Sequence, residues 1–108
     1  MNVHRQLVTE EGQTAVEIRV RGRVQGVGFR PTVWRFAREE GLSGEVLNDS
    51  DGVLVRVGGS TKAIADFIAR LWKEPPPLGR IDRIETQLFD GQLPAEFRIA
   101  ESTGGGAH

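Results

Sequence analysis

A glycine-rich loop, Gly22-Arg23-Val24-Gln25-Gly26-Val27-Gly28-Phe29-Arg30, lies between a stretch of alternating residues and a stretch with helical periodicity. Its three glycines allow the backbone to turn its amides inward, as in the concave nests that bind phosphate. Arg30 begins the expected helix, where the positive end of the helix dipole makes a cation mildly unfavourable. An oxyanion held by the loop amides and the guanidinium group would account for that placement. The alternative is a plain connection with an exposed arginine.

The residues on either side of the loop predict a strand and then a helix. Residues 15–21 alternate between apolar and charged side chains, which is typical of a half-buried strand. Pro31 is suited to the first turn of a helix, and Gly41 is suited to end it. The apolar positions of this helix recur at intervals of three and four residues, at Val33, Phe36 and Ala37.

The rest of the chain predicts further strands and a second helix. We expect strands over residues 43–48 and 53–57, joined by a turn over 48–52 and broken by Gly58-Gly59. Ser60 is expected to cap a second helix that ends before the prolines at 75–77, and its apolar face comprises Ile64, Phe67, Ile68, Leu71 and Trp72. A fourth strand over 84–88 and a short fifth one over 97–99 follow.

This element order predicts an α+β fold, the ferredoxin-like βαββαβ sandwich, with two helices on one face of an antiparallel sheet and a short fifth strand. At 108 residues the chain is long enough for one such domain. We expect a flexible leader over residues 1–13, the domain over 14–101 and a Gly-rich linker or tail over 102–108. Trp34 and Trp72 are interpreted as core or core-edge aromatics.

The composition excludes several classes of function. A net charge of −1 argues against a globally basic nucleic-acid binder, and the absence of cysteine excludes disulfides, thiolate metal sites and a cysteine nucleophile. No apolar run approaches the length of a membrane span, so we expect a soluble, cytoplasmic protein. Arg19, Arg21 and Arg23 alternate along one strand and are interpreted as a solvated face.

No metal ion or cofactor is expected. His4 and His108 fall in the predicted tails without partners. Asp49 and Asp51 are close enough to suggest a cation site, but in a turn this spacing more often caps backbone amides. The glycine loop itself lacks the Gly-Lys-Ser/Thr ending of a Walker loop and the third glycine of a dinucleotide fingerprint.

Asn48 stands at the end of the second expected strand, in Gly44-Glu45-Val46-Leu47-Asn48-Asp49-Ser50-Asp51-Gly52. An asparagine before Asp and Gly is commonly a turn residue. In the βαββαβ order, however, the end of strand two lies near the start of helix one, so Asn48 is expected to approach Arg30. A neutral amide there could accept a hydrogen bond from water and donate one to a phosphate oxygen, which suits orienting a nucleophile.

These two stretches resemble the signatures of the acylphosphatase family, in the right order and spacing. The resemblance covers residues 15–99. It implies that Arg30 binds phosphate, that Asn48 orients the attacking water, and that the backbone of the loop forms an amide cradle at Gln25, Gly26, Val27, Gly28 and Phe29.

A narrower resemblance is to the N-terminal acylphosphatase-like domain of the HypF family of hydrogenase maturation carbamoyltransferases. The residues that carry it are Arg30-Pro31-Thr32-Val33-Trp34, the stretch from Pro75 to Asp82, and Ser102-Thr103-Gly104-Gly105-Gly106. It implies a hydrolase-type domain acting on acyl phosphates, with carbamoyl phosphate as the biological ligand. It also implies further domains of the same polypeptide and other hydrogenase maturation proteins as partners.

Two other functions remain open. The domain could bind carbamoyl phosphate with little turnover in isolation, and the sequence does not separate this from hydrolysis. RNA binding uses the same βαββαβ order but needs aromatic residues on the exposed face of the sheet. That face is expected to present Glu17, Arg19, Arg21, Leu54 and Arg56, which disfavours RNA.

Overall fold

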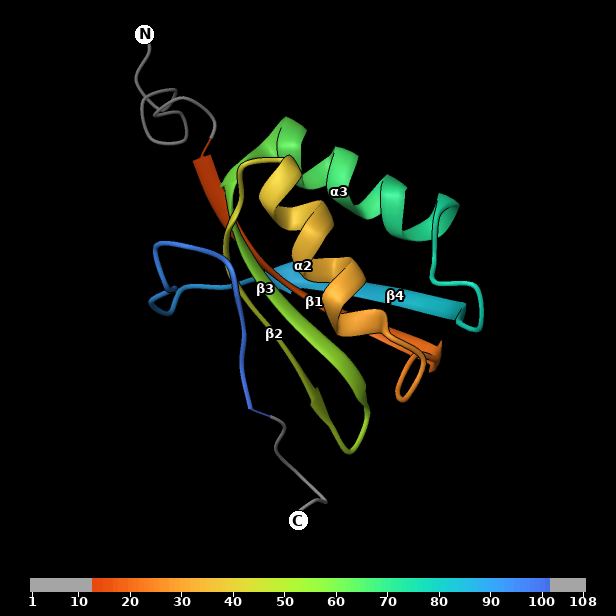
Figure 1. Cartoon of the computed structure of the whole chain (residues 1–108). Helices are drawn as coiled ribbons and strands as arrows, with labels where there is room; N and C mark the ends of the chain where they lie inside the picture. Colours follow the sequence, from red (N-terminus) through yellow and green to blue (C-terminus); the bar gives the residue numbers. More distant parts are fainter. Residues whose placement is uncertain (1–12, 102–108) are drawn as a thin grey trace, which may run out of the picture.

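The computed structural model describes residues 13–101 and contains two helices and one five-stranded sheet (Figure 1). The elements are β1 (Gln13–Arg23), α2 (Phe29–Glu39), β2 (Ser43–Asp49), β3 (Gly52–Ser60), α3 (Thr61–Lys73), β4 (Arg80–Leu88) and β5 (Arg98–Ile99). The ferredoxin-like βαββαβ order is therefore confirmed. Gln13, expected in the leader, is instead the first residue of β1; the rest of the leader and the predicted tail over 102–108 lie outside the described residues.

The sheet is mixed rather than wholly antiparallel. Its strands are arranged in the order β4-β1-β3-β2-β5, and all neighbours are antiparallel except β2 and β5, which are parallel. β5 can run parallel to β2 because the chain crosses from the far edge of the sheet after β4, through residues 89–97, before it pairs with Glu45 and Val46. The fifth strand was therefore predicted correctly, but its direction was not.

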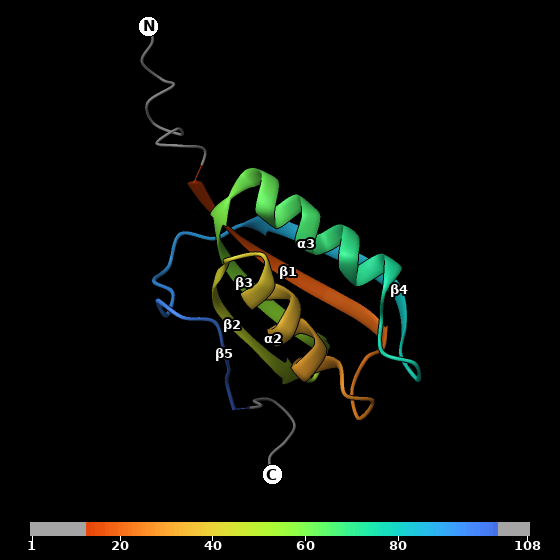
Figure 2. The ribbon, with the colours of Figure 1, turned by 45° about the horizontal axis from the view of Figure 1, so that its top comes forward.

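Both helices cover the same face of the sheet (Figure 2). Each strand of the central three contributes fully buried aliphatic residues to that face, including Ile18, Val20, Val46, Val53 and Val55. The helices contribute the predicted apolar positions, and these residues together form a single core, in which the helical members are Phe29, Val33, Phe36, Ala37, Ile64, Phe67 and Leu71.

The predicted end of the third strand is wrong. Gly58 and Gly59 do not end the third strand, because β3 continues to Ser60 and pairs with β1 along this stretch. A Cβ on Gly59 would lie 2.6 Å from the side chain of Leu42, so the glycine makes room for a core residue instead of breaking the strand. Ser60 does cap α3 as predicted, accepting a hydrogen bond from the Ala63 amide at 3.0 Å.

The two tryptophans lie on the surface and not in the core. Trp34 is 37% exposed and Trp72 is 49% exposed. The guanidinium group of Arg38, one turn along α2, lies 5.0 Å from the centre of the Trp34 ring, so a cation lies over this ring at the surface. Helical spacing identified the apolar faces but did not show where each face ends.

The other face of the sheet carries ion pairs across the strands. Arg56 on β3 contacts Glu17 on β1 at 2.9 Å and Glu45 on β2 at 3.3 Å. Arg19 on β1 reaches across β3 to Asp49 on β2. Leu54, expected to be exposed, is buried because it lies on β3 beneath this crossing.

No helix in the described part of the chain is long and apolar enough to cross a membrane.

Substitution of Gly44 on β2 tests how closely this strand packs against β3. It has φ 128°, and a Cβ there would overlap the carbonyl oxygen of Arg56 on the neighbouring strand. We expect Gly44→Ala to lower the free energy of unfolding by more than about 3 kcal/mol, since the clash is with the backbone. Urea denaturation followed by circular dichroism measures the loss.

Gly41→Ala is the matched control for this change. Gly41 also has a positive φ, of 75°, but a Cβ there meets nothing within 4 Å. Its replacement should therefore cost only the strain of the left-handed backbone, about 1–2 kcal/mol. Equal losses in the two variants would show that the close approach of the strands is not what requires Gly44.

Candidate functional site

The glycine loop is anchored at both ends by buried side chains. Val24 and Phe29 are each 2% exposed, and Val27 packs against the core between them. Gly26 and Gly28 have φ values of 76° and 80°, in the left-handed region. A Cβ on either glycine would meet nothing within 4 Å, so their backbone conformation, and not a lack of space, calls for glycine.

The loop leads into the first turn of α2 with its amides available. Gly28 is the N-cap of α2 and provides no side-chain cap. Within the described residues, no group accepts a hydrogen bond from the backbone amides of Gly26, Val27, Gly28 or Phe29. Four such amides at the positive end of a helix dipole form the kind of site that binds phosphate.

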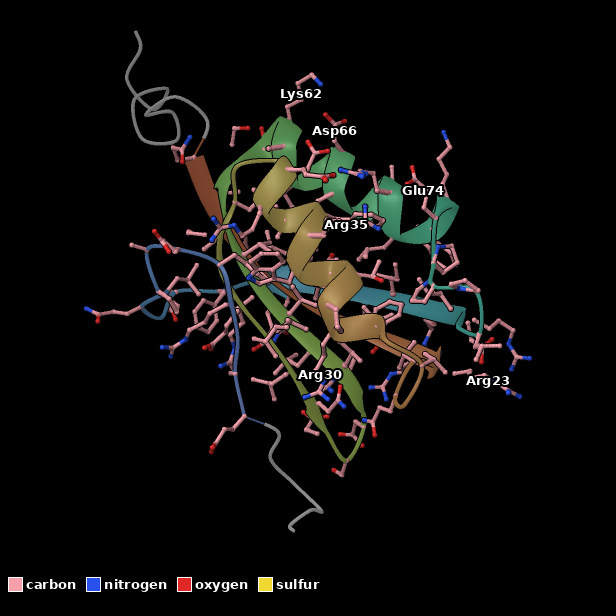
Figure 3. All side chains as sticks on the ribbon, viewed as in Figure 1. Arg23, Arg30, Arg35, Lys62, Asp66 and Glu74 are labelled. Carbon is pink, nitrogen blue, oxygen red and sulfur yellow. The ribbon has the colours of Figure 1, made fainter. Side chains whose placement is uncertain are left out.

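Arg30 is the second residue of α2 and lies at the end of the sheet where β2 finishes. Figure 3 shows its side chain extending from the start of α2 toward the lower ends of β2 and β3. Arg23, at the other side of the loop, extends away from this region. Of the two arginines of the loop, only Arg30 therefore extends toward the end of the sheet where β2 finishes.

Asn48 lies at the same end of the molecule. Only residues 40–42 connect the end of α2 to the start of β2, so the two elements run in opposite directions and the start of α2 lies over the end of β2 (Figure 1). By alternation Asn48 faces the helices, as fully buried Val46 does. Its Oδ1 atom is buried and, among the described residues, is the only buried side-chain nitrogen or oxygen without a hydrogen-bond partner.

The side chain of Gln25 joins the loop to the β2–β3 turn. Its Nε2 atom donates hydrogen bonds to the carbonyl oxygens of Asp49 and Gly52, each at 2.8 Å. The sequence predicted a role only for the backbone of Gln25. Nothing in the sequence indicates this use of the side chain, because its partners are carbonyl groups 24 and 27 residues away.

An ion pair holds the turn from the other side. Arg19 donates two hydrogen bonds to the carboxylate of Asp49, at 2.5 and 2.9 Å. The bonds from Arg19 lower the pKa of Asp49 below its usual 3.8, against the opposing effect of partial burial. The side chain of Arg19 is only 18% exposed, so it does not belong to a solvated face as predicted; Arg21 is paired with Glu85 at the surface.

The carboxylate of Asp49 caps the turn that also contains Asp51. Asp49 Oδ1 accepts a hydrogen bond from the Asp51 amide at 2.9 Å, which is the turn-capping role that the spacing also predicted. Across residues 13–101, no three His, Cys, Asp or Glu side chains form a group that could hold a metal ion. His4 and His108 lie outside the described residues.

Comparison with known proteins agrees with the motifs. A family model for acylphosphatase matches residues 16–99. An acylphosphatase of Rhizobium meliloti is 36% identical over 93 residues, which cover 85% of this chain and 97% of that protein. The chain belongs to the acylphosphatase family.

Within that family the chain is similar to the N-terminal region of HypF proteins. It is 53% identical over 94 residues to carbamoyltransferase HypF of Rhodobacter capsulatus, which covers 86% of this chain and 12% of that protein. A crystal structure of full-length HypF in the phosphate- and nucleotide-bound form matches with a TM-score of 0.82 and 37% identity, over 87% of this chain and 12% of that one. The chain thus spans about an eighth of the length of these relatives.

The Arg19–Asp49 pair makes stability depend on pH. Because the pKa of Asp49 is lower in the folded state than its usual 3.8, the contribution of the charged pair is complete above that value and is lost as the pH falls through the folded pKa. We expect Asp49→Asn to be less stable than the parent at pH 7, and this difference to shrink below about pH 4. Urea denaturation between pH 2 and 7 measures the difference.

Asp66→Asn serves as the control for this prediction. Asp66 pairs with Lys62 at an exposed position on α3, where an ion pair contributes little. It should change stability by less than about 0.5 kcal/mol at pH 7. A constant difference between Asp49→Asn and the parent over the whole range would contradict an electrostatic role for the Arg19–Asp49 pair.

Proposed function

We propose that this domain binds acyl phosphates and hydrolyses the bond between their acyl and phosphate groups. The phosphate group is held by Arg30 and by the amides of residues 25–29. The same contacts oppose the negative charge that spreads over the phosphoryl oxygens in the transition state. Catalysis in this proposal depends on positioning and electrostatics, because residues 22–30 contain no serine, threonine, cysteine or histidine to act as a nucleophile.

The reaction balances with water as the nucleophile. The water oxygen forms a bond to phosphorus as the bond from phosphorus to the acyl oxygen breaks, and the acyl group leaves as a carboxylate. The protons of the water pass to the phosphate product, so no protein base is required. Asn48 aligns the water with the breaking bond by accepting one of its hydrogen bonds.

The buried and unpartnered Oδ1 of Asn48 is the observation that carries this proposal. Leaving a buried acceptor without a donor costs about 1–3 kcal/mol, and the other buried side-chain polar atoms of the described residues have partners. A bound water molecule would provide the missing donor. A residue that served only the turn would have no need of a buried, unpartnered acceptor beside the start of α2.

We further propose carbamoyl phosphate as the biological substrate, within a larger carbamoyltransferase that acts in nickel-iron hydrogenase maturation. The similarity to carbamoyltransferase HypF supports this proposal. So does the fact that the chain matches 12% of the length of those longer proteins, and so do the HypF-like motifs. In this setting the further domains of the polypeptide and other maturation proteins are its partners, in the cytoplasm. The second candidate is a module that binds carbamoyl phosphate and releases little phosphate by itself.

Arg30 and Asn48 should have separable effects. Arg30→Ala removes the charge that contacts phosphate in both the ground and transition states, so phosphate affinity and turnover should both fall. Asn48→Ala retains that charge but leaves the water unaligned, so phosphate should bind nearly as before while turnover falls about 100-fold. Calorimetric titration with inorganic phosphate and an assay of acetyl phosphate hydrolysis measure the two effects.

Arg23→Ala and Gln92→Ala are the matched controls, since both side chains are exposed and neither belongs to the proposed contacts. Both controls should retain turnover and phosphate affinity within about twofold. Normal turnover in Asn48→Ala would make Asn48 a turn residue only. No turnover in the parent, together with phosphate binding that requires Arg30, would favour the binding module.

The substrate proposal has a separate test. We expect kcat/KM for carbamoyl phosphate to equal or exceed that for acetyl phosphate, since both carry the same phosphate group and differ only in the acyl substituent. Phosphate release from the two compounds, measured side by side under identical conditions, provides the comparison. A clear preference for acetyl phosphate would argue for a general acylphosphatase rather than a carbamoyl-specific one.

A further inference from the structure

Gln25 is exposed, yet its amide nitrogen donates to two acceptors at once. A primary amide has two N–H groups, and here each is directed at a carbonyl oxygen 2.8 Å away, one on Asp49 and one on Gly52. These two residues face each other in the register at the closing end of the β2–β3 hairpin. The Gln25 side chain therefore ties the middle of the glycine loop to the end of the hairpin.

The hairpin end to which Gln25 is bound is itself well fixed. The carboxylate of Asp49 is held by two hydrogen bonds from Arg19 and one from the Asp51 amide. Gly52 is packed so closely on β1 that a Cβ there would lie 2.6 Å from the carbonyl oxygen of Val20. The loop, with its positive-φ glycines and unpaired amides, is by comparison held by few hydrogen bonds.

The two halves of the proposed active site belong to these two segments. The amide cradle is on the loop and the water-orienting Asn48 immediately precedes Asp49 on the hairpin. In-line attack requires the phosphorus atom and the water to be placed relative to each other, and a shift of about 1 Å can cost as much as 100-fold in rate. A direct connection between loop and hairpin end is the part of the structure that could set this relative position.

We propose that Gln25 is a positioning residue that acts through Asn48, by locking the phosphate cradle in register with the water that Asn48 orients. This inference rests on the proposed function. Gln25 contacts neither phosphate nor water through its side chain. Its loss leaves Arg30, the cradle amides and Asn48 all present but removes the direct link between the loop and the hairpin end, so that their relative position is fixed less precisely.

The substitution Gln25→Met tests this role, because methionine has a similar length but cannot donate a hydrogen bond. We expect kcat for acetyl phosphate to fall about tenfold, and the affinity for inorganic phosphate to fall by less than about threefold, since the cradle and Arg30 remain. Gln92→Met, the same change at an exposed glutamine outside the site, should leave both values unchanged within twofold. Thermal melting of each variant confirms that it is folded.

The decisive measurement is a double-mutant cycle with Asn48→Ala. If Gln25 acts through Asn48, then adding Gln25→Met to Asn48→Ala should lower kcat by less than about twofold, because no aligned water remains to be displaced. A full tenfold loss in both backgrounds would show independent effects and overturn the proposal. An unchanged kcat in Gln25→Met alone would also overturn it.

A second measurement does not depend on turnover. In ¹⁵N-labelled parent protein, addition of phosphate should shift the amide signals of the loop and also those of residues 48–52, since the side chain of Gln25 connects them. In Gln25→Met the shifts should stay within the loop and the start of α2. Shifts that reach residues 48–52 equally in both proteins would refute the connection, whereas equal turnover in Asn48→Ala and parent would contradict the proposed function of Asn48 instead.

Discussion

Burial of one face of α2 against the valine-rich face of the sheet determines where this helix lies. Val33, Phe36 and Ala37 are all but fully buried, and the strands opposite them present a continuous aliphatic surface. The three-residue connection to β2 then requires the helix to run back along that strand. Consequently the start of α2, with its unpaired amides and Arg30, must lie over the end of β2, where Asn48 is found. The site follows from hydrophobic packing, and its polar groups need no attraction for one another to meet.

The outer face of the sheet, which points away from the helices, holds the strands together through ion pairs, whereas the inner face packs on the helices. On the outer face the strands are joined by arginine–carboxylate pairs that cross one or two strands, with Arg19–Asp49 spanning β3 and Arg56 contacting both of its neighbours. Such pairs at a partly exposed surface contribute little each, but bidentate geometry fixes the direction of the side chain and of the backbone that carries it. At Asp49 this fixed backbone is one residue from Asn48. The outer face therefore affects the precision of the site on the inner face, even though the sheet separates them.

Much of this arrangement could be predicted from the sequence, because it depends on local periodicity. Alternation in residues 15–21 and helical spacing at Val33, Phe36 and Ala37 identified the elements, and their order gave the topology and brought Arg30 near Asn48. The predictions from sequence were wrong where contacts between residues far apart in the chain determine the structure. The parallel direction of β5 depends on a crossing segment without periodicity. Gly58 and Gly59 continue β3 because they pair with β1, and Gly59 is a glycine because Leu42 occupies the space that a Cβ would fill. The two hydrogen bonds of the Gln25 side chain could not be predicted for the same reason. Their acceptors are backbone carbonyl groups, which every residue type has.

The distribution of unsatisfied polar groups sets the start of α2 and the end of β2 apart from the rest of the described structure. In the described residues, buried side-chain nitrogen and oxygen atoms have hydrogen-bond partners except for Asn48 Oδ1, and helix α3 is capped by Ser60 while α2 has no side-chain cap. Both exceptions lie at the same end of the sheet, together with two glycines in left-handed conformations. The unpaired acceptor and the uncapped start of the helix lower the stability of the free domain, and a phosphate and a water molecule bound between Arg30 and Asn48 would compensate for both. Binding of these two molecules at this end of the sheet would therefore stabilise the folded domain.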